Sequence, residues 1–412
     1  MNQATANTLL LRNARIIQPE RTIESVSLLI QNGRIAQIVD STSDESIKTD
    51  SVIDLHGLTL FPGFIDVHIH GAAGVDAMNA SADDLRGVAD FLARHGVTSW
   101  LPTLVPAPDE EYEQAVHAIE EAIKGQDGNL HTQARVLGVH YEGPFVNSEQ
   151  CGALHREHFR TFGRTADVDG LPMIASTASE SLHARDARTQ PIHMMTLAPE
   201  VDGGIELISE LNRRGWIVSI GHTRANRGVL DEARNAGAHH MTHFMNAMTP
   251  LHHRDLGAVG WGLIHGDVTI DMIADGIHLD RKVLRLITKS KGVERVSLIS
   301  DAIAAAGLGD GEYEIWGEKI GVTSGRTQNK HGSIAGSVIT MLDSVRTMLS
   351  LGFSEPEVAR MASLNPARLL GIDHEGGSLE EGKRADLVAL DENQNVALTI
   401  IDGQISYRSQ RL

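Results

Sequence analysis

The chain has 412 residues, of which 41% are hydrophobic and 22% charged, so it is long enough for a large core and for two domains. Its formal net charge of −18 argues against nucleic acid or an anionic membrane as the main partner. The single cysteine, Cys151, excludes an internal disulfide framework and fits a reducing compartment. With no export signal and no apolar run of membrane length, the expected location is the cytoplasm.

Both ends of the chain predict short β-strands. They are expected at residues 9–17, 26–31 and 34–39, and again at 385–390, 396–401 and 404–407. Neither end alone supplies enough strands for a stable sheet. We therefore expect residues 1–60 and 373–412 to form one small β-sandwich domain together.

The middle of the chain, residues 61–372, alternates between apolar runs and amphipathic stretches. Strands are expected at 64–70, 98–103, 135–142, 194–198, 217–222, 239–243, 269–274 and 296–301. Helices are expected at 81–95, 109–124, 203–214, 224–235, 280–289, 339–351 and 354–364. About eight strand–helix units in one domain predict an α/β fold, a (β/α)8 barrel. A doubly wound sheet is less favoured, because no glycine-rich phosphate loop follows the first strand.

The first strand of this middle region ends in two histidines, His68 and His70. Residues i and i+2 of a strand face the same side, so the two imidazoles would point together, as in a metal site. However, with 21 histidines in the chain, about one His-x-His pair is expected by chance. The pair therefore needs support from other strand ends.

Other expected strands also end in potential metal ligands. Glu142 ends the third strand, His222 and His243 end two later strands, and Asp301 ends the last. In a (β/α)8 barrel the carboxyl ends of the strands meet at one face, which carries the active site. Imidazole and carboxylate groups are ligands of hydrolytic divalent metals. Each residue alone also fits a strand or helix cap or a buried structural histidine, so the joint placement carries the metal-site prediction.

Longer motifs surround these residues. They are Pro62-Gly63-Phe64-Ile65-Asp66-Val67-His68-Ile69-His70, Glu142-Gly143-Pro144-Phe145, Leu197-Ala198-Pro199-Glu200, His243-Phe244-Met245-Asn246-Ala247-Met248 and Glu381-Gly382-Lys383-Arg384-Ala385-Asp386-Leu387. On these motifs, which are spread over nearly the whole chain, the sequence resembles the N-acetylglucosamine-6-phosphate deacetylases of the amidohydrolase superfamily. The first and last motifs mark the superfamily, whereas the other three are typical of the deacetylases.

The resemblance implies a metal centre. Glu142, His222 and His243 match the main metal ligands, and His68 and His70 match a second metal site that some members lack. One or two divalent ions are implied, with Glu142 as the bridge; zinc is expected, and iron, manganese and cobalt accept the same ligands. Asp301 matches the catalytic carboxylate, which also lies among the metal ligands.

The resemblance also implies a substrate site. His278 matches a residue that holds the sugar and the acetyl carbonyl, where it can act in catalysis by stabilising the oxyanion. The backbone N–H groups of Asn246 and Ala247 would meet the phosphate. Arg254 would reach the site of a neighbouring subunit, which implies a homodimer. The remaining matches are loop residues: Gly152, Ala153, Ile334, Ala335 and Gly336.

The function implied is removal of the acetyl group from N-acetylglucosamine 6-phosphate, giving glucosamine 6-phosphate and acetate. Three alternatives stay open. They are the galactosamine epimer of the substrate, another amidohydrolase activity such as a cyclic amidase or deaminase, and a non-catalytic sugar-phosphate sensor. A cyclic amidase would not need Arg254 or the Asn246–Ala247 pair, and a sensor would not need Asp301.

Overall fold

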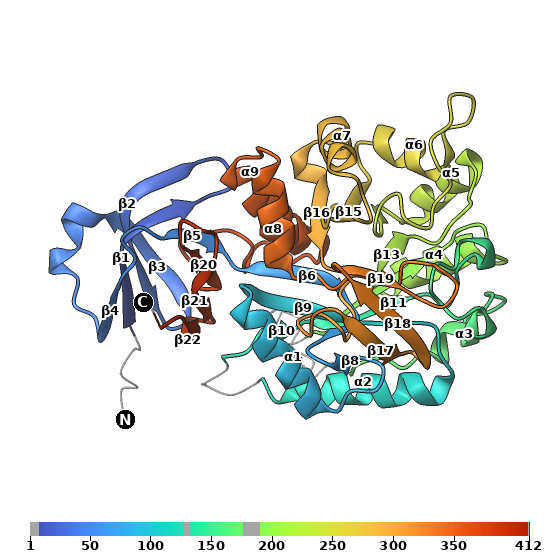
Figure 1. Ribbon diagram of the computed structural model, residues 1–412, viewed down its shortest axis with the longest axis horizontal. Coiled ribbons are helices and arrows are strands. Elements are labelled where there is room, and N and C mark those ends of the chain that lie inside the picture. Colours follow the sequence, from blue (N-terminus) through green and yellow to red (C-terminus); the bar gives the residue numbers. More distant parts are fainter. Residues whose placement is uncertain (1–7, 127–131, 176–189, 411) are drawn as a thin grey trace.

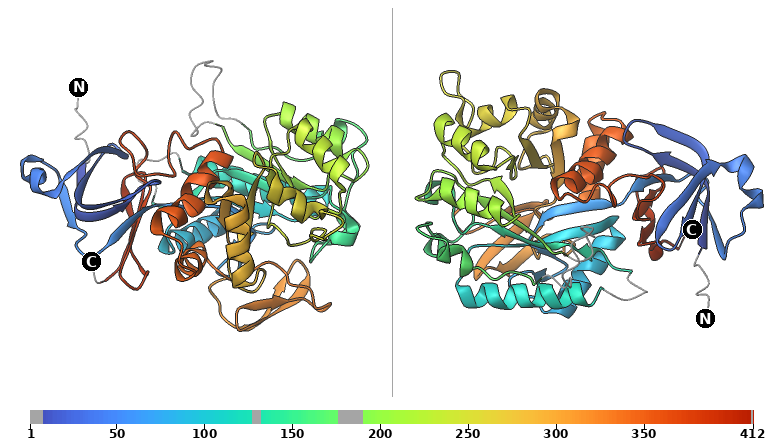
Figure 2. Two further views of the ribbon diagram at one scale, coloured as in Figure 1. Left: turned by 90° about the horizontal axis from the view of Figure 1, so that it is seen from above. Right: turned by 180° about the vertical axis from the view of Figure 1, so that it is seen from behind.

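The computed structural model describes residues 8–126, 132–175, 190–410 and 412. Its strands and helices form a large barrel and a smaller sheet beside it, which contains both the first and the last strands (Figure 1). Figure 2 shows that this sheet lies to one side of the barrel in two further views. Each part has its own buried apolar cluster.

The barrel consists of parallel strands. Along the ring they are β6 (Phe64–Ile69), β9 (Val97–Leu104), β11 (Gly138–Glu142), β12 (Ile192–Leu197), β13 (Ile217–Ile220), β14 (His240–Met241), β15 (Thr269–Ile273) and β16 (Val296–Ile299). The ring closes where the N–H of Asp301, just beyond β16, donates to the carbonyl of His68 in β6 at 2.9 Å. The short β10 (Arg135–Val136) extends the pairing of β9. The predicted (β/α)8 barrel is confirmed.

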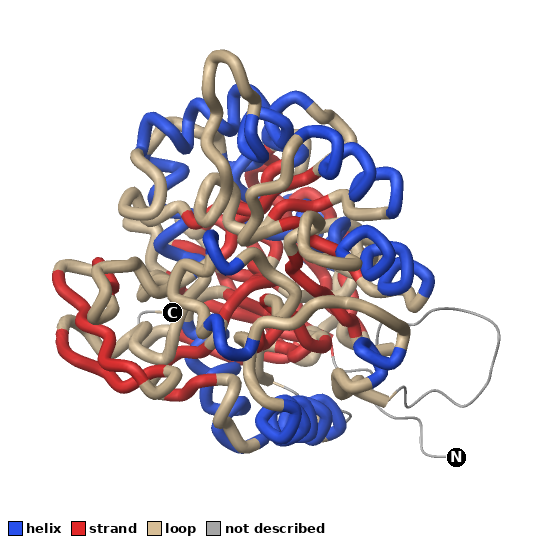
Figure 3. Tube along the Cα trace, turned by 90° about the vertical axis from the view of Figure 1, so that its right-hand side faces the viewer, coloured by secondary structure: helices blue, strands red, loops and turns tan. Residues whose placement is uncertain are grey.

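Helices surround the strands, as Figure 3 shows with helices in blue and strands in red. They are α1 (Ala82–Arg94), α2 (Asp109–Lys124), α3 (Ala166–Asp169), α4 (Gly204–Arg213), α5 (Arg227–Ala236), α6 (Gly257–Ile264), α7 (Arg281–Lys291), α8 (Met341–Ser350), α9 (Glu355–Ala359) and α10 (Asn365–Leu369). Between α9 and α10 lies a π-helical turn, η5 (Arg360–Leu364). None of the described helices combines the length and the apolar character that a membrane span requires.

Local sequence explains where the helices begin and end. At the start of α1, Ser81 accepts from the N–H of Asp84, whose carboxylate accepts from the N–H of Ser81 in return. Leu85 and Leu92 share the buried face of this helix, as their spacing of seven requires. Helix α5 ends at Gly237, whose φ of 116° suits glycine best.

Strands from both ends of the chain build the second sheet. They are β1 (Thr8–Ile17), β2 (Thr22–Gln31), β3 (Arg34–Asp40), β4 (Ser51–Asp54), β5 (Thr59–Pro62), β20 (Leu387–Leu390), β21 (Val396–Ile401) and β22 (Gln404–Arg408). The two groups meet where β5 pairs antiparallel with β20. The predicted small domain from both termini is therefore confirmed. Its division from the barrel at residues 60 and 373 stays a prediction, and residue 60 lies inside β5.

One antiparallel sheet was not expected from the sequence. It comprises β17 (Gly311–Ile315), β18 (Glu318–Thr323) and β19 (Arg326–Gln328), inserted between β16 and α8. In Figure 2 this orange hairpin projects from the barrel. A two-stranded ribbon, β7 (Gly71–Ala72) with β8 (Val75–Asp76), follows β6.

Candidate active site

Three potential ligands converge from three strands of the barrel, β11, β13 and β14. Glu142 is the last residue of β11, and His222 and His243 each follow their strand, β13 or β14, by two residues. Glu142 Oε1 lies 2.9 Å from the Nε2 atom of each histidine, and the two Nε2 atoms lie 3.1 Å apart. All three side chains are buried, and the structure brings these three predicted residues together.

The histidine pair of β6 completes a second group around the same carboxylate. The Nε2 atoms of His68 and His70 lie 3.3 Å apart, so the two rings do point together. His70 Nε2 lies 3.3 Å from Glu142 Oε2. Asp301 Oδ1 lies 3.2 Å from both Nε2 atoms. Glu142 is thus shared by two ligand groups, His68–His70–Glu142 and Glu142–His222–His243, each with its ligand atoms within 4.8 Å of one another.

The predicted strands 217–222, 239–243 and 296–301 were too long at their carboxyl ends. The structure ends β13, β14 and β16 two residues before His222, His243 and Asp301. Each of these three residues has a left-handed backbone, with φ of 47°, 32° and 50°. Such backbone is costly for a non-glycine residue and gathers at functional sites. The turn it makes directs the three side chains toward the common centre.

Hydrogen bonds at the far side of two of the imidazole rings, those of His222 and His70, fix their orientation. His222 Nδ1 donates to the carbonyl of Gln150 at 2.7 Å, and His70 Nδ1 donates to the carbonyl of Thr103 at 3.2 Å. Because a carbonyl only accepts, the neutral ring then carries its lone pair on Nε2, which faces the centre. This is the tautomer that a metal ligand needs, so the donor set fits a divalent cation.

The charges of the cluster favour a cation at its centre. Burial opposes ionisation of Glu142, but the imidazoles of His68, His222 and His243 hold its pKa well below the usual range. Burial also disfavours a charged His70, yet its hydrogen bonds with Asp301 and Glu142 raise its pKa to about 10. In the same way Glu142 raises the pKa of His243 to about 9 against the effect of burial. Two ionised carboxylates in so small a space attract protons or metal ions.

A cavity of about 270 Å³ lies over this cluster. The predicted site residues that line it are His70, Glu142, Gly152, Ala153, His222, Asn246, Ala247, His243, His278, Asp301, Ile334 and Gly336. His68 is fully buried beneath them. The cavity is also lined by four residues that were not among those predicted: Leu154, Ile273, Trp316 and Ser333.

Two predicted residues lie elsewhere. Ala335 is fully buried among apolar side chains under the β17–β18 hairpin, and its N–H donates to Thr327 Oγ1 at 3.3 Å. Arg254 is exposed on the loop after β14, where its guanidinium contacts His253 Nε2 at 2.6 Å. Neither residue touches the cavity of its own chain.

The loops on the β14–β15 side supply polar groups. Asp275 Oδ2 accepts from His278 Nδ1 at 2.7 Å, so Nε2 of that ring is presented to the cavity. The N–H of Asn246 donates to the carbonyl of His243 at 2.9 Å, and its Nδ2 donates to the same carbonyl at 3.1 Å. Both of these donor atoms of Asn246 are therefore engaged within the loop. Of the two residues, Ala247 is the better placed to bind an anion.

Comparisons with known proteins agree with this architecture. The model of the amidohydrolase family matches residues 59–406. The N-acetylglucosamine-6-phosphate deacetylase of Bacillus subtilis (strain 168) is 34% identical over 406 residues, which cover 98% of each chain. The N-acetylgalactosamine-6-phosphate deacetylase of Escherichia coli O157:H7 is 36% identical over 401 residues, which cover 97% of this chain and 99% of the relative.

Solved structures show the same likeness. N-acetylglucosamine-6-phosphate deacetylase from Pasteurella multocida superimposes with a TM-score of 0.85 at 30% identity, covering 97% of this chain and 99% of that one. A mutant of the Mycobacterium smegmatis enzyme in complex with N-acetyl-D-glucosamine-6-phosphate gives a TM-score of 0.84 at 28% identity, covering 98% and 100%. By sequence and by fold, this chain belongs to the amidohydrolase family.

Proposed function

We propose that this chain is a deacetylase that converts N-acetylglucosamine 6-phosphate and water into glucosamine 6-phosphate and acetate. One observation carries the proposal. Asp301, a buried carboxylate, lies at 3.2 Å from two imidazoles and beside the Glu142 group, on the floor of a cavity large enough for a small ligand. Relatives with this name align over almost the whole chain.

The metal centre follows from the donor set. Glu142, His222 and His243 would hold one divalent ion, and His68 and His70 would hold a second, with Asp301 next to it. Zinc is the ion we propose. A bound ion would polarise the amide carbonyl and lower the pKa of a water molecule.

Asp301 is the proposed acid–base group. Burial raises the pKa of Asp301, but the neighbouring His68 and His70 keep this pKa below the usual range. The carboxylate is therefore ionised at neutral pH. It can therefore take a proton from the attacking water and then deliver this proton to the amine as the C–N bond breaks. The amine leaves well only when it is protonated, so one carboxylate serves both steps.

The other proposed contacts position the sugar phosphate. Asp275 holds His278 Nδ1, so Nε2 can accept from a sugar hydroxyl or, when the ring is protonated, donate to the developing oxyanion. The backbone of Ala247 would meet the phosphate, with Asn246 beside it. Gly152, Ala153, Ile334 and Gly336 would cover the sugar. Ala335, buried next to them, would support that loop.

Acetate release tests the activity. The metal-loaded protein is assayed with N-acetylglucosamine 6-phosphate and its galactosamine epimer, and its metal content is measured in parallel. We expect acetate from both, with the higher kcat/KM for the glucosamine epimer. The galactosamine epimer is the second candidate, because a relative that bears this name is 36% identical. A reversed preference would reassign the substrate, and no acetate from either would refute the proposal.

We also propose a homodimer in which Arg254 binds the phosphate in the neighbouring subunit's site. Its support is that Arg254 is exposed and away from its own cavity, while a guanidinium fork suits a phosphate. Mixing Arg254→Ala with Asp301→Asn subunits tests this idea. Hybrid dimers contain one site with both native residues only if Arg254 crosses between subunits, so activity should return on mixing.

The proposed location of the enzyme is the cytoplasm. A chain of 412 residues with a single cysteine suits a reducing compartment. Cell fractionation with an antibody against the chain would test it.

A further inference from the structure

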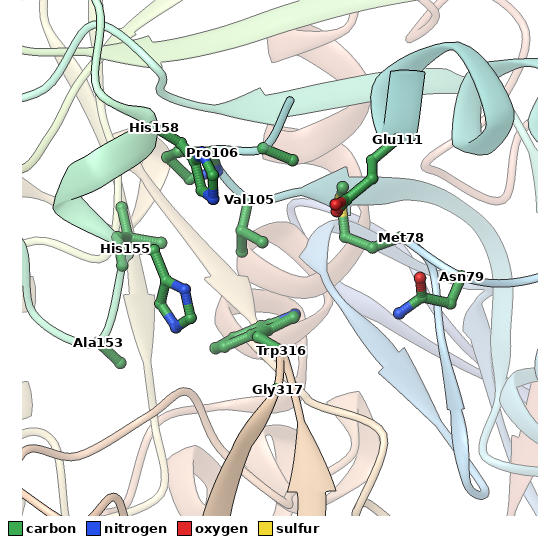
Figure 4. Close-up of a pocket in the computed structure, with 12 residues that line it drawn as sticks. Met78, Asn79, Val105, Pro106, Glu111, Ala153, His155, His158, Trp316 and Gly317 are labelled. Atoms are coloured by element: carbon green, nitrogen blue, oxygen red, sulfur yellow. The ribbon is translucent and has the colours of Figure 1, made fainter. Parts of the chain in front are cut away.

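A second cavity adjoins the catalytic one. Its volume is about 300 Å³, and it lies over the ends of β6 and β9. Ala153, Leu154 and Trp316 line both cavities, so these three residues form the wall between them. Figure 4 shows Trp316 with Ala153 and His155 on one side of it and Met78 on the other.

Trp316 is an unusual residue for its place in the backbone. It forms, with Gly317, the two-residue turn that joins β17 to β18, where Ile315 pairs with Glu318. Both turn residues have positive φ, 53° for Trp316 and 70° for Gly317. Such turns favour asparagine or aspartate at the first position, and a large aromatic residue there is strained. The indole ring instead stands edge-on against His70, with the ring centres 5.1 Å apart.

The geometry of the barrel decides which part of the substrate meets this wall. Under the proposed function, the sugar lies toward Asn246 and His278, which follow β14 and β15. The amide carbonyl must lie over the ligands around Glu142. The acyl group then points away from the sugar, toward the β6–β9 side, where Trp316 stands.

The second cavity is suited to an acyl chain in its part next to this wall. Met78, Val105 and Leu154 are buried apolar side chains that line it. Its polar lining comes from Asn79 and Glu111, which are exposed, and from His155 and His158, which are half-buried. An aliphatic chain that passed the wall would therefore meet an apolar surface.

We propose that Trp316 determines acyl-chain specificity, closing a subsite for longer aliphatic N-acyl groups that lies behind it. This inference rests on the proposed function and extends it to the acyl part of the substrate. With Trp316 in place, the site accepts the acetyl group. Without the indole ring, a propionyl or butyryl chain would extend into the second cavity. The reaction is otherwise the same: water oxygen joins the acyl carbon, the C–N bond breaks, and the amine gains the proton.

The test compares N-acetyl-, N-propionyl- and N-butyryl-glucosamine 6-phosphate by NMR of the carboxylate released. A misfitting methylene costs about 10- to 200-fold in kcat/KM, so the native enzyme should disfavour the butyryl substrate by at least ~100-fold. Trp316→Asn, which suits the turn, should raise kcat/KM for the butyryl substrate at least ~10-fold. Glu314→Ala, an exposed change in the same hairpin, is the matched control and should leave the preference unaltered.

Filling the second cavity should reverse the gain. Val105→Phe in the Trp316→Asn background should restore the preference for acetyl; if it does not fold, Asn79→Trp at the exposed mouth replaces it. An unchanged acyl preference in Trp316→Asn, or a native enzyme that hydrolyses butyryl as fast as acetyl, would overturn the subsite alone. No acetate from the native enzyme would overturn the proposed function as well.

Discussion

Replacing Asp301 with asparagine isolates proton transfer from the rest of the site. The two side chains have nearly the same shape, so the buried position, 6% exposed, gains no cavity. The amide oxygen can still accept from an imidazole at about the present 3.2 Å. What disappears is the charge and the ability to take up and return a proton. Acid–base catalysis contributes typically about 10²- to 10⁴-fold, so we expect kcat to fall by this factor, or about 2.7–5.5 kcal/mol in the barrier.

The assay must separate proton transfer from metal loss and unfolding. Acetate release is measured together with metal content, binding of the substrate by calorimetry, and thermal unfolding. We expect Asp301→Asn to keep substrate binding within a few-fold of the native protein. Asp83→Asn, on the exposed surface of α1, serves as the control and should keep full activity. Turnover at the native rate in Asp301→Asn would refute the assigned role, whatever the metal content.

Three further predictions address metal binding and stability. Chelation should abolish acetate release and lower the melting temperature, because an ion at 100 times its Kd stabilises the folded state by about 2.7 kcal/mol. Adding zinc should restore both the activity and the melting temperature. Full activity in verified metal-free protein would contradict the metal role. Burial lowers the pKa of His193 to about 4. The unfolded chain therefore binds the proton first, and up to about 3 kcal/mol of stability should be lost as pH falls from 6.5 to 4; urea titrations of His193→Gln should show a flatter pH profile. Ser81→Ala should lower the free energy of unfolding by about 1 kcal/mol through loss of the α1 cap without changing kcat, as calorimetry and acetate assays can check.

The barrel could be predicted from the sequence because its strands are mostly apolar and buried on both faces. Val97–Leu104 is buried along its whole length, as are Phe64–Ile69 and Gly138–Glu142. Strands buried on both faces have a strongly hydrophobic sequence, and the turn residues on either side mark where each strand begins and ends. The metal-site prediction followed from the joint placement of histidines and carboxylates at the ends of several such strands, because strand or helix capping explains each residue alone but not their coincidence. The substrate residues came only from the family resemblance.

The β17–β18 hairpin could not be predicted in this way. Its sequence, Gly311–Thr323, alternates charged residues with single apolar ones, and most of its side chains are partly or fully exposed. A short exposed hairpin has a weak hydrophobic signal, and Trp316 in its turn stands where asparagine is usual. The aromatic residue next to Gly317 was the one available hint. Helix α6 was missed for another reason: it is rich in glycine and almost uniformly apolar, without an amphipathic period.

The closure of the barrel and the assembly of the proposed metal centre depend on the same residues. The N–H of Asp301 closes the ring at His68, and Ser300 Oγ donates to the buried carboxylate of Asp66 at 2.6 Å across the same seam. These bonds compensate the left-handed backbone of Asp301, which by itself would cost about 1–3 kcal/mol. When the first and last strands separate, Asp301 and His68 separate with them. The ligands can therefore converge only in a closed barrel, and an ion bound between them would in turn stabilise that closure.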